Sequence, residues 1–194
     1  MKKIVFIVII IVLLLGGYFF FTSKWYELWR APEIGDLTSE EINIQYEELL
    51  QAGLDKEAAG DCPGAILEYE KLLKIAPGAQ PPKNNIAECC LKMEDYACAE
   101  KWFTEIIKKE YDPNAVIKLS RLYQDKMKDN QKAINILMSA HQQFPGYLDF
   151  AYQLGFLYKQ IGDKENALKY LNKALEISPE DQNVKDLIEE LEKK

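Results

Sequence analysis

The sequence predicts an all-α protein in which one membrane-spanning helix precedes a helical solenoid. Three observations support this. Residues 4–21 form an apolar run without a single charge. From residue 38 onward the chain shows helical periodicity and no convincing β alternation. Small residues in that part recur with a period near 34 residues, which indicates stacked repeats and not a globular core.

The composition argues against several classes of function. The chain of 194 residues carries 24 basic and 31 acidic side chains, so its net charge is −7. A nucleic-acid-binding surface would need a basic footprint, and nucleic acid is therefore not an expected partner. The single histidine, His141, has no nearby nucleophile, and no phosphate-binding glycine motif is present. We therefore expect no enzymatic activity, no catalytic residue, no cofactor and no metal.

The apolar run at residues 4–21 is long enough to cross a membrane. At about 1.5 Å per residue it extends for about 27 Å, close to the roughly 30 Å hydrocarbon core of a bilayer. A cleaved signal peptide is the alternative, but its apolar region is usually about 7 to 15 residues long. The segment that follows offers neither a small-x-small cleavage site nor a lipobox cysteine. We predict that residues 4–22 are an uncleaved signal anchor.

Flanking charges predict the orientation of this anchor. Lys2, Lys3 and the amino terminus crowd positive charge into residues 1–3, whereas Lys24 and Arg30 are spread more widely behind the run. Because basic residues favour the cytoplasmic side, residues 1–3 form a cytosolic n-region and the rest of the chain lies outside. The prediction is a single-pass inner-membrane protein with a periplasmic domain.

A short linker, residues 23–37, follows the anchor. A proline and a glycine break any continuous helix there. Trp25, Tyr26 and Trp29 fall where an aromatic belt would meet the lipid headgroups. The alternative is that these aromatic side chains pack on the first helix of the next domain.

Residues 38–194 form the predicted repeat domain, which opens with a capping box between Thr38 and Glu41. A small residue is followed 12 or 13 positions later by another one, in the pairs Gly53 and Ala65, Ala87 and Ala99, Ser120 and Ala133, and Gly155 and Ala167. The spacing of 13 implies one inserted residue in the turn of the third unit. Prolines end three of the second helices, at Pro77, Pro145 and Pro179. The predicted units are 46–79, 80–112, 113–147 and 148–181, with a solvating capping helix at 182–194.

The spacing has a direct physical reason. Two antiparallel helices approach closely only where small residues face each other at the crossing, as Gly155 and Ala167 would. One such hairpin cannot bury its own apolar face, so neighbouring hairpins must stack.

This pattern resembles the tetratricopeptide-repeat family. The fourth unit matches through Leu154, Gly155, Tyr158, Gly162, Asp163, Ala167, Ala174 and Pro179. The third matches through Leu119, Tyr123, Ala133, Ala140 and Pro145, and the second through Ala87, Asp95, Tyr96, Ala99 and Phe103, although Pro113 falls late. The early tryptophan of the family is absent from all four units. The resemblance implies a right-handed superhelix whose concave face is lined by the first helix of each unit.

The resemblance also implies which side chains line a partner-binding groove. Two positions per unit carry over: Leu50 and Leu54, Asn84 and Glu88, Ile117 and Arg121, and Tyr152 and Phe156. The two leucines occupy positions where relatives that clamp a terminal carboxylate carry Lys and Asn, so that binding mode is not expected. The apolar members suit an aliphatic or aromatic partner segment. The alternative is that Tyr152 and Phe156 pack against the capping helix.

The four cysteines, Cys62, Cys89, Cys90 and Cys98, are expected to lie along one rim of the solenoid. An exported domain sits in a disulfide-permissive compartment, so one or two bridges are predicted among them. Four cysteines allow three full pairings. Cys62 with Cys89 is favoured because these residues would face each other across adjacent units, whereas Cys89 and Cys90 should not pair. The alternative is that all four are small buried apolar residues.

The sequence thus predicts a membrane-anchored, extracytoplasmic scaffold that holds a protein or peptide partner in cell-envelope assembly or folding. Two other classes stay open. One is a self-assembling structural scaffold, a homo-oligomer. The other is a thiol-active or chaperone-like envelope protein that works through the cysteine rim.

Overall fold

The computed structural model describes residues 38–193. The predicted n-region 1–3, anchor 4–22 and linker 23–37, with Trp25, Tyr26 and Trp29, lie outside the described residues. The chain divides into two compact units, residues 1–44 and 45–194, and the description below concerns the second unit and the start of its first helix. Between residues 38 and 193, no helix is long and apolar enough to cross a membrane.

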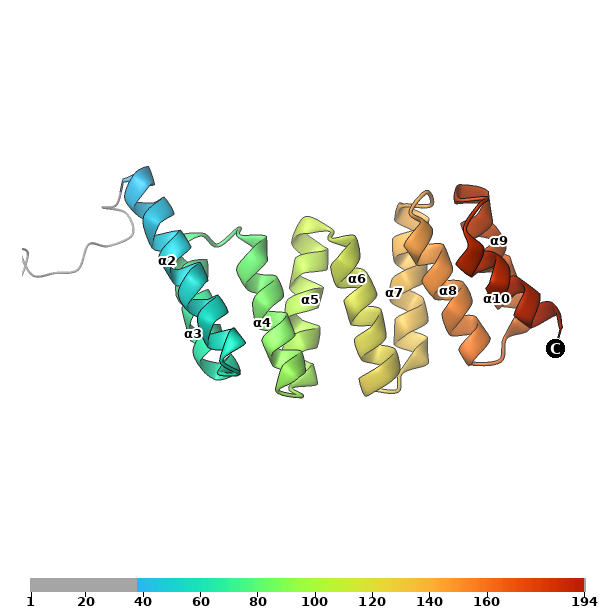
Figure 1. The fold of residues 1–194 in the computed structure, drawn as a ribbon, viewed down its shortest axis with the longest axis horizontal. Coiled ribbons are helices and arrows are strands. Elements are labelled where there is room, and N and C mark those ends of the chain that lie inside the picture. Colours follow the sequence, from blue (N-terminus) through green and yellow to red (C-terminus); the bar gives the residue numbers. More distant parts are fainter. Residues whose placement is uncertain (1–37, 194) are drawn as a thin grey trace, which may run out of the picture. The chain divides into compact units, whose positions relative to one another are not determined.

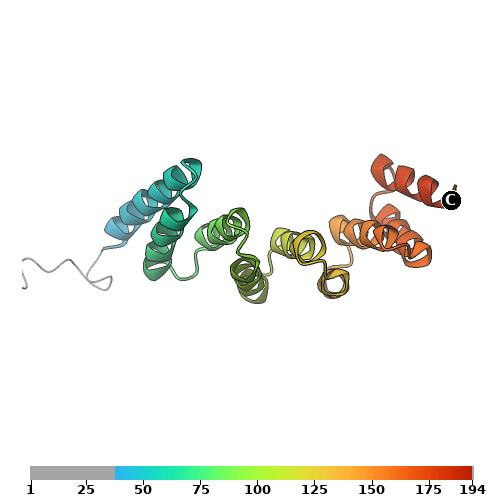
Figure 2. The same cartoon turned by 90° about the horizontal axis from the view of Figure 1, so that it is seen from below.

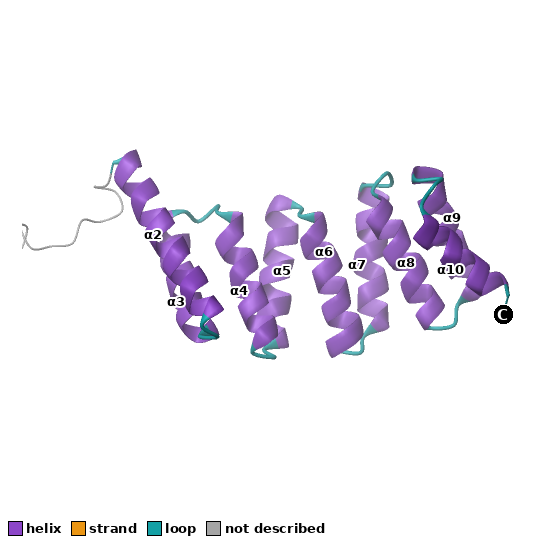
Figure 3. Ribbon diagram, in the orientation of Figure 1, coloured by secondary structure: helices purple, strands orange, loops and turns teal. Residues whose placement is uncertain are grey.

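The described part of the chain consists of helices and short turns (Figure 1). Figure 3 shows no strand among these residues. The helices are α2 (Ser39–Ala58), α3 (Cys62–Ile75), α4 (Gln80–Lys92), α5 (Tyr96–Glu110), α6 (Pro113–Arg121), the π-helix η2 (Leu122–Lys126), α7 (Asn130–Gln143), α8 (Leu148–Gln160), α9 (Lys164–Ile177) and α10 (Gln182–Glu192).

Consecutive helices from α3 to α10 pack against each other along the chain. Figure 2 shows them alternating between two rows, with α4, α6 and α8 in one row and α5, α7 and α9 in the other. This arrangement confirms the predicted all-α helical repeat fold. Helices α4, α6, α8 and α10 begin at residues 80, 113, 148 and 182, the first residues of the predicted later units and capping helix.

The turn inside each hairpin has the same chemistry in all four units. The second helix of each unit begins after an aspartate whose carboxylate accepts a hydrogen bond from the backbone N–H three residues on, at 2.9–3.0 Å. These residues are Asp61, Asp95, Asp129 and Asp163, each 34 positions after the last. Since the first N–H groups of a helix have no partner within it, each carboxylate satisfies one of them.

The residue before each capping aspartate has a left-handed backbone conformation. Gly60 and Gly162 have φ values of 81° and 82°, and Glu94 and Lys128 have values of 59° and 57°. Glycine adopts this conformation without steric cost, whereas side chains with a Cβ do so less readily. The turn therefore keeps one geometry in every unit even where the residue is not glycine.

The extra residue of the third unit lies in its first helix and not in the turn, which corrects the prediction. The capping aspartates of the other units donate their N–H to the carbonyl five residues back, as Asp163 does to Tyr158, but Asp129 donates to Tyr123, six back. The intervening η2 absorbs this residue, because its Met127 N–H bonds the Leu122 carbonyl five positions earlier.

The junction between the second and third units is one residue shorter than the others. The residues after α3, α7 and α9 are followed by Pro77, Pro145 and Pro179, and the residue before a proline is disfavoured in helical conformation. The corresponding position 111 is Tyr111, so α5 continues one residue further and ends there in a left-handed cap with φ 46°. Asp112 alone then separates this cap from α6.

The predicted small residues lie in the core. Ala65, Ala87, Ala99, Ala133 and Ala167 are completely buried. The closest approach at Gly155 differs in detail from the expected contact with Ala167, because a Cβ there would lie 2.6 Å from Leu171 Cγ. At Gly53 a Cβ would lie 2.3 Å from the ring of Tyr69. Each glycine therefore admits a large side chain from the second helix of its own unit.

Both ends of the described chain begin helices with side-chain caps. The predicted capping box is confirmed, since the Thr38 N–H donates to Glu41 at 2.8 Å and the Glu41 N–H donates to Thr38 Oγ1 at 3.2 Å. At the other end, α10 buries Val184 and Leu191 in a small cluster with residues of α8 and α9. This helix covers the apolar face that α8 and α9 would otherwise expose.

Candidate functional site

The first helices of units two, three and four form a groove with three adjoining pockets. The largest, about 520 Å³, is lined by Asn84, Asp112, Asn114, Ile117, Lys118, Arg121, Asp149, Tyr152 and Gln153. A second, about 380 Å³, is lined by Arg121, Gln124, Asp125, Tyr152, Gln153, Phe156 and Gln160. The third, about 290 Å³, lies between α4 and α6 and is lined by Glu88, Leu91, Lys118, Arg121, Leu122, Asp125 and Lys126. Together they form one continuous surface, which we call the groove.

Arg121 is the residue that all three pockets share. It is exposed at the end of α6, and among residues 38–193 it forms no ion pair. Its guanidinium presents five N–H donors in a fixed plane that suits a carboxylate. Arg121 is therefore the free cation at the centre of the groove.

The other charged side chains of the groove differ from Arg121 because partners within the fold engage them. Lys118 on α6 forms an ion pair with Glu88 on α4 at 2.5 Å. Lys92 on α4 pairs with Glu57 on α2 at 2.7 Å, and Lys159 on α8 pairs with Glu190 on α10 at 2.5 Å. One polar pair thus joins each of these first helices to its neighbour.

The π-helix shapes the middle of the groove. Gln124 and Asp125 belong to η2 and line the pocket beside α8. The amide of Gln124 is hydrogen-bonded to that of Gln160 on α8, so the widened turn is connected to the fourth unit. π-Helical turns of this kind occur frequently at functional sites. The residue inserted into the third unit therefore faces the groove.

Tyr152 and Phe156 lie one turn apart on α8 with their rings stacked, 6.4 Å between centroids and 14° between planes. Both are half-buried. Phe156 lines one pocket, whereas Tyr152 lines two and also packs against the cluster that contains residues of the capping helix. Tyr152 therefore fits both of the roles considered from the sequence, and Phe156 presents its ring to the groove.

Six of the eight groove positions inferred from the sequence line these pockets: Asn84, Glu88, Ile117, Arg121, Tyr152 and Phe156. The other two do not. Leu50 packs partly against the core, and Leu54 is 40% exposed on α2 without lining any of the three pockets.

Several polar groove residues were not inferred from the sequence, among them Asp149, Gln153 and Gln160 on α8. Asp149 lies three residues before Tyr152, and Gln160 lies four after Phe156, so they share the face of α8 that carries the aromatic pair. That spacing was the available signal. The contribution of Asp112 carried no such signal, because it depends on the shortened junction before α6.

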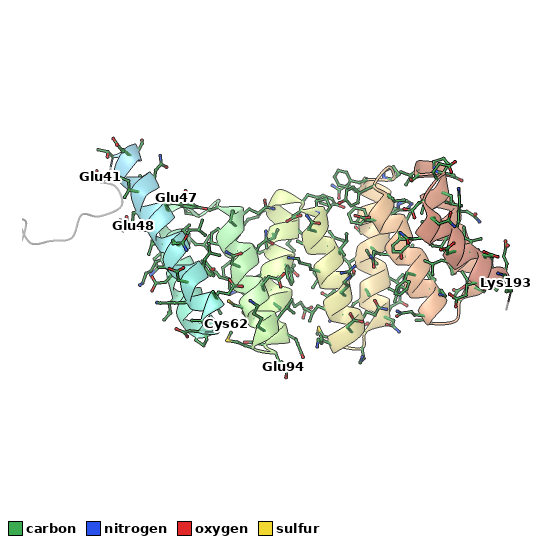
Figure 4. The ribbon with its side chains drawn as sticks, in the orientation of Figure 1. Glu41, Glu47, Glu48, Cys62, Glu94 and Lys193 are labelled. Carbon is green, nitrogen blue, oxygen red and sulfur yellow. A yellow bond between two sulfur atoms is a disulfide. The ribbon has the colours of Figure 1, made fainter. Side chains whose placement is uncertain are left out.

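The cysteines lie at the turn end of the hairpins, and Figure 4 shows Cys62 and Glu94 at that same end. Cys90 and Cys98 form a disulfide bond, with their Cα atoms 5.7 Å apart. Cys62 and Cys89 are free thiols and are buried. Burial, together with a hydrogen bond to Cys62, raises the pKa of Cys89 to about 12. A thiol in this state is a poor nucleophile at neutral pH, which argues against a thiol-active role.

His141 lies in the core, 8% exposed, with its ring edge-on to Tyr170 at 5.9 Å. Burial, and to a smaller extent the charge of Lys173, lower its pKa below the ordinary value of 6.5. Its Nδ1 is buried without a hydrogen-bond partner. His141 therefore packs as a neutral ring. Among residues 38–193, no cluster of three or more His, Cys, Asp or Glu side chains could hold a metal ion.

Comparison with known proteins supports the resemblance found in the sequence. A family model described as tetratricopeptide repeat matches residues 126–191, which include the second helix of the third unit, the fourth unit and most of α10. A search of curated proteins gave no significant match.

Solved structures share the fold. A crystal structure of a MamA protein has 22% sequence identity and a TM-score of 0.56, over 77% of this chain and 87% of that one. A tetratricopeptide repeat protein from Parabacteroides merdae has 18% identity and a TM-score of 0.63, over 77% and 60%. YrrB, described as a TPR protein with an unusual peptide-binding site, has 21% identity and a TM-score of 0.53, over 77% and 75%.

Proposed function

We propose that this protein is a non-catalytic scaffold that binds a segment of a partner protein in the groove formed by α4, α6 and α8. The observation that carries the proposal is the free guanidinium of Arg121 at the point where three pockets meet, beside the stacked rings of Tyr152 and Phe156. Aromatic and arginine side chains dominate the energetics of most protein interfaces.

The groove also suits the backbone of an extended segment. Asn84, Asn114, Gln124 and Gln153 bring amides, which offer both donors and acceptors, to the pocket walls. A peptide chain in extended conformation has unpaired N–H and C=O groups that such side chains can satisfy. The partner is therefore an extended segment.

The chemistry of the groove specifies the side chains of that segment. A carboxylate of the partner would pair with Arg121, since Lys118 is engaged by Glu88. An aliphatic or aromatic side chain next to it would contact either the rings on α8 or the apolar pocket formed by Leu91 and Leu122. The proposed ligand is a segment with an acidic residue beside an apolar one.

Crosslinking in intact cells tests this proposal. A photo-crosslinking residue at Gln153 lies in the groove, and the same residue at Thr104 lies on α5, outside it. We expect a defined partner to be captured from position 153 and not from position 104. Equal capture from both positions would remove the groove from consideration.

Charge-matched variants then separate local recognition from general attraction. Arg121 and Lys108 are both exposed, and Arg121→Glu and Lys108→Glu change the net charge equally. We expect Arg121→Glu to weaken partner capture about tenfold or more, and Lys108→Glu to leave it unchanged. Tyr152→Ala and Phe156→Ala should also reduce capture, and unchanged capture by both variants would contradict the proposal.

The scaffold is proposed to act at a membrane, outside the cytoplasm, in cell-envelope assembly or folding. Two observations support this: the charge-free run at residues 4–21, with Lys2 and Lys3 before it, and the Cys90–Cys98 bridge, because disulfides persist in oxidising compartments. An anchor raises the effective concentration of the scaffold near membrane-bound partners.

Fractionation tests this location. The full chain should remain in the membrane pellet after alkaline extraction, and protease added to spheroplasts should digest the repeat domain. Replacing two residues of the run, Ile9→Lys and Val12→Lys, should release the chain from the membrane. Recovery of the wild-type chain in the soluble fraction would exclude the anchor.

A further inference from the structure

Four cysteines gather where the first unit meets the second. Cys62 begins α3 and Cys89 lies in the last turn of α4, and these two helices pack against each other. Cys62 is 4% exposed and Cys89 is completely buried. Their thiols are joined by a hydrogen bond, whereas the adjacent Cys90 is bonded to Cys98. Two sulfur atoms in hydrogen-bond contact need only a small displacement to reach bonding distance.

The surroundings of the pair favour no other use of it. No third metal-binding side chain joins Cys62 and Cys89 in the described part of the chain. The nearest charges are those of Glu57 and Lys92, which form an ion pair with each other at 2.7 Å. The Glu57 carboxylate also accepts a hydrogen bond from the Tyr69 hydroxyl at 3.0 Å. The two thiols are therefore each other's only partners for covalent chemistry.

We infer that Cys62 and Cys89 form a second disulfide bond when the chain meets a disulfide oxidant, so that the first two units become covalently joined. The oxidant is a protein disulfide or a small-molecule disulfide. One cysteine thiolate attacks it, which forms a mixed disulfide and expels one thiol of the oxidant. The second cysteine attacks the mixed disulfide and expels the other thiol. The oxidant gains the two electrons and the two protons that Cys62 and Cys89 lose.

The two bridges have different structural consequences. Cys90 and Cys98 are 8 residues apart and join the helices of one hairpin. Cys62 and Cys89 belong to different hairpins, and their bond would join α3 to α4 across the boundary between units. Because neighbouring units of a solenoid are otherwise held by noncovalent contacts alone, this bond would prevent the first unit from separating from the second.

The bond should form before the two helices finish packing. Burial raises the pKa of the Cys89 thiol, so its thiolate is scarce at neutral pH in the folded chain. An oxidant in solution also has little access to two buried sulfur atoms. We therefore expect fast oxidation in a partly unfolded chain and slow oxidation in the native one.

Peptide mapping of the full-length chain in detergent tests the inference. The chain is reduced in mild denaturant, oxidised with oxidised glutathione while the denaturant is removed, alkylated after complete unfolding, and cleaved at lysine. The relevant peptides are residues 57–71, 84–92 and 93–101. We expect all three in one disulfide-linked species and no alkylated cysteine. Alkylated Cys62 in a sample where 84–92 is linked to 93–101 would overturn the inference.

A matched pair of double variants assigns the bond. In Cys90→Ala/Cys98→Ala we expect peptide 57–71 linked to 84–92, which identifies Cys89 as the partner of Cys62. In Cys62→Ala/Cys89→Ala we expect only 84–92 linked to 93–101. Linkage of 57–71 in wild type but not in the first variant would assign Cys62 to Cys90 and overturn the pairing. The wild-type map stands on its own if a variant fails to fold, as helical circular dichroism would reveal.

Discussion

Gly162 is held in a conformation that other residues adopt at a cost. Its φ is 82°, and no atom lies within 4 Å of the position a Cβ would take. Gly162→Ala should therefore destabilise the fold by about 1 kcal/mol through the backbone alone. Gly146→Ala is the matched control, since Gly146 also has free space but no positive φ, and it should change stability by less than about 0.5 kcal/mol. Chemical unfolding of the full chain measures both. Equal effects would show that the left-handed turn carries no strain.

His141 makes the stability of the fold depend on pH in a single window. Its pKa in the folded chain lies below 6.5, so the unfolded chain binds the proton more readily. The stabilisation is complete above the unfolded pKa and is lost as the pH falls below it. The unfolding free energy should therefore decrease between about pH 7.5 and about pH 5.5, where histidine is the side chain that titrates. His141→Gln should flatten this dependence, and an unchanged slope would assign it to another group.

The sequence predicted which residues are small and buried, because that requirement acts within one hairpin. Gly53, Gly155 and the alanines of the crossings must be small wherever two helices approach closely, so their spacing repeats in every unit. The pairing of Glu88 with Lys118 could not be predicted in this way. It depends on how two neighbouring units are turned relative to each other, which is set by contacts spread over several helices.

At the level of helices, each capping aspartate should stabilise the helix it precedes. Asp129 accepts a hydrogen bond from the Lys132 N–H at 2.9 Å. Asp129→Ala should destabilise the fold by about 1 kcal/mol, because one N–H at the start of α7 loses its partner. Asp125→Ala removes the same charge from a carboxylate that caps no helix, and it should have a smaller effect. Thermal unfolding of both variants provides the comparison.

The two irregular helices show where prediction from sequence stopped. The spacing of 13 residues in the third unit correctly indicated an extra residue, yet it did not distinguish a longer turn from a π-helix. The turn is held in place by its capping aspartate and its left-handed residue, Lys128, so the insertion had to be absorbed in the preceding helix. Since this chemistry repeats every 34 residues, comparing the four aspartates would have located the insertion.

For the whole domain, the capping helix α10 protects the apolar end of the array. It buries Val184 and Leu191 against residues of α8 and α9. A chain that stops after Asp181 should therefore unfold at a thermal midpoint lower by about 5 °C or more and should aggregate. A chain that stops after Glu192 keeps the buried residues of α10 and is the control. An unchanged midpoint after the longer truncation would show that α10 is dispensable.

The groove as a whole was only partly predictable. Its location on the first helices followed from the family resemblance, and six inferred positions line its pockets. Which of its charges remain free did not follow, because Lys118 and Arg121 lie on the same helix and look equivalent in the sequence. Only the placement of Glu88 on the neighbouring unit distinguishes them.

The constant interval between the capping aspartates has a consequence for how such a chain can change its length. Both irregularities of the array, the short junction at Tyr111 and Asp112 and the π-helix η2, lie between Asp95 and Lys128. They cancel, so the turns on either side stay in phase. Excising residues 95–128 would join Glu94 to Asp129, two residues whose counterparts are already neighbours in every turn. The product would be a shorter array of uniform units, and the chain can thus lose a module without a scar.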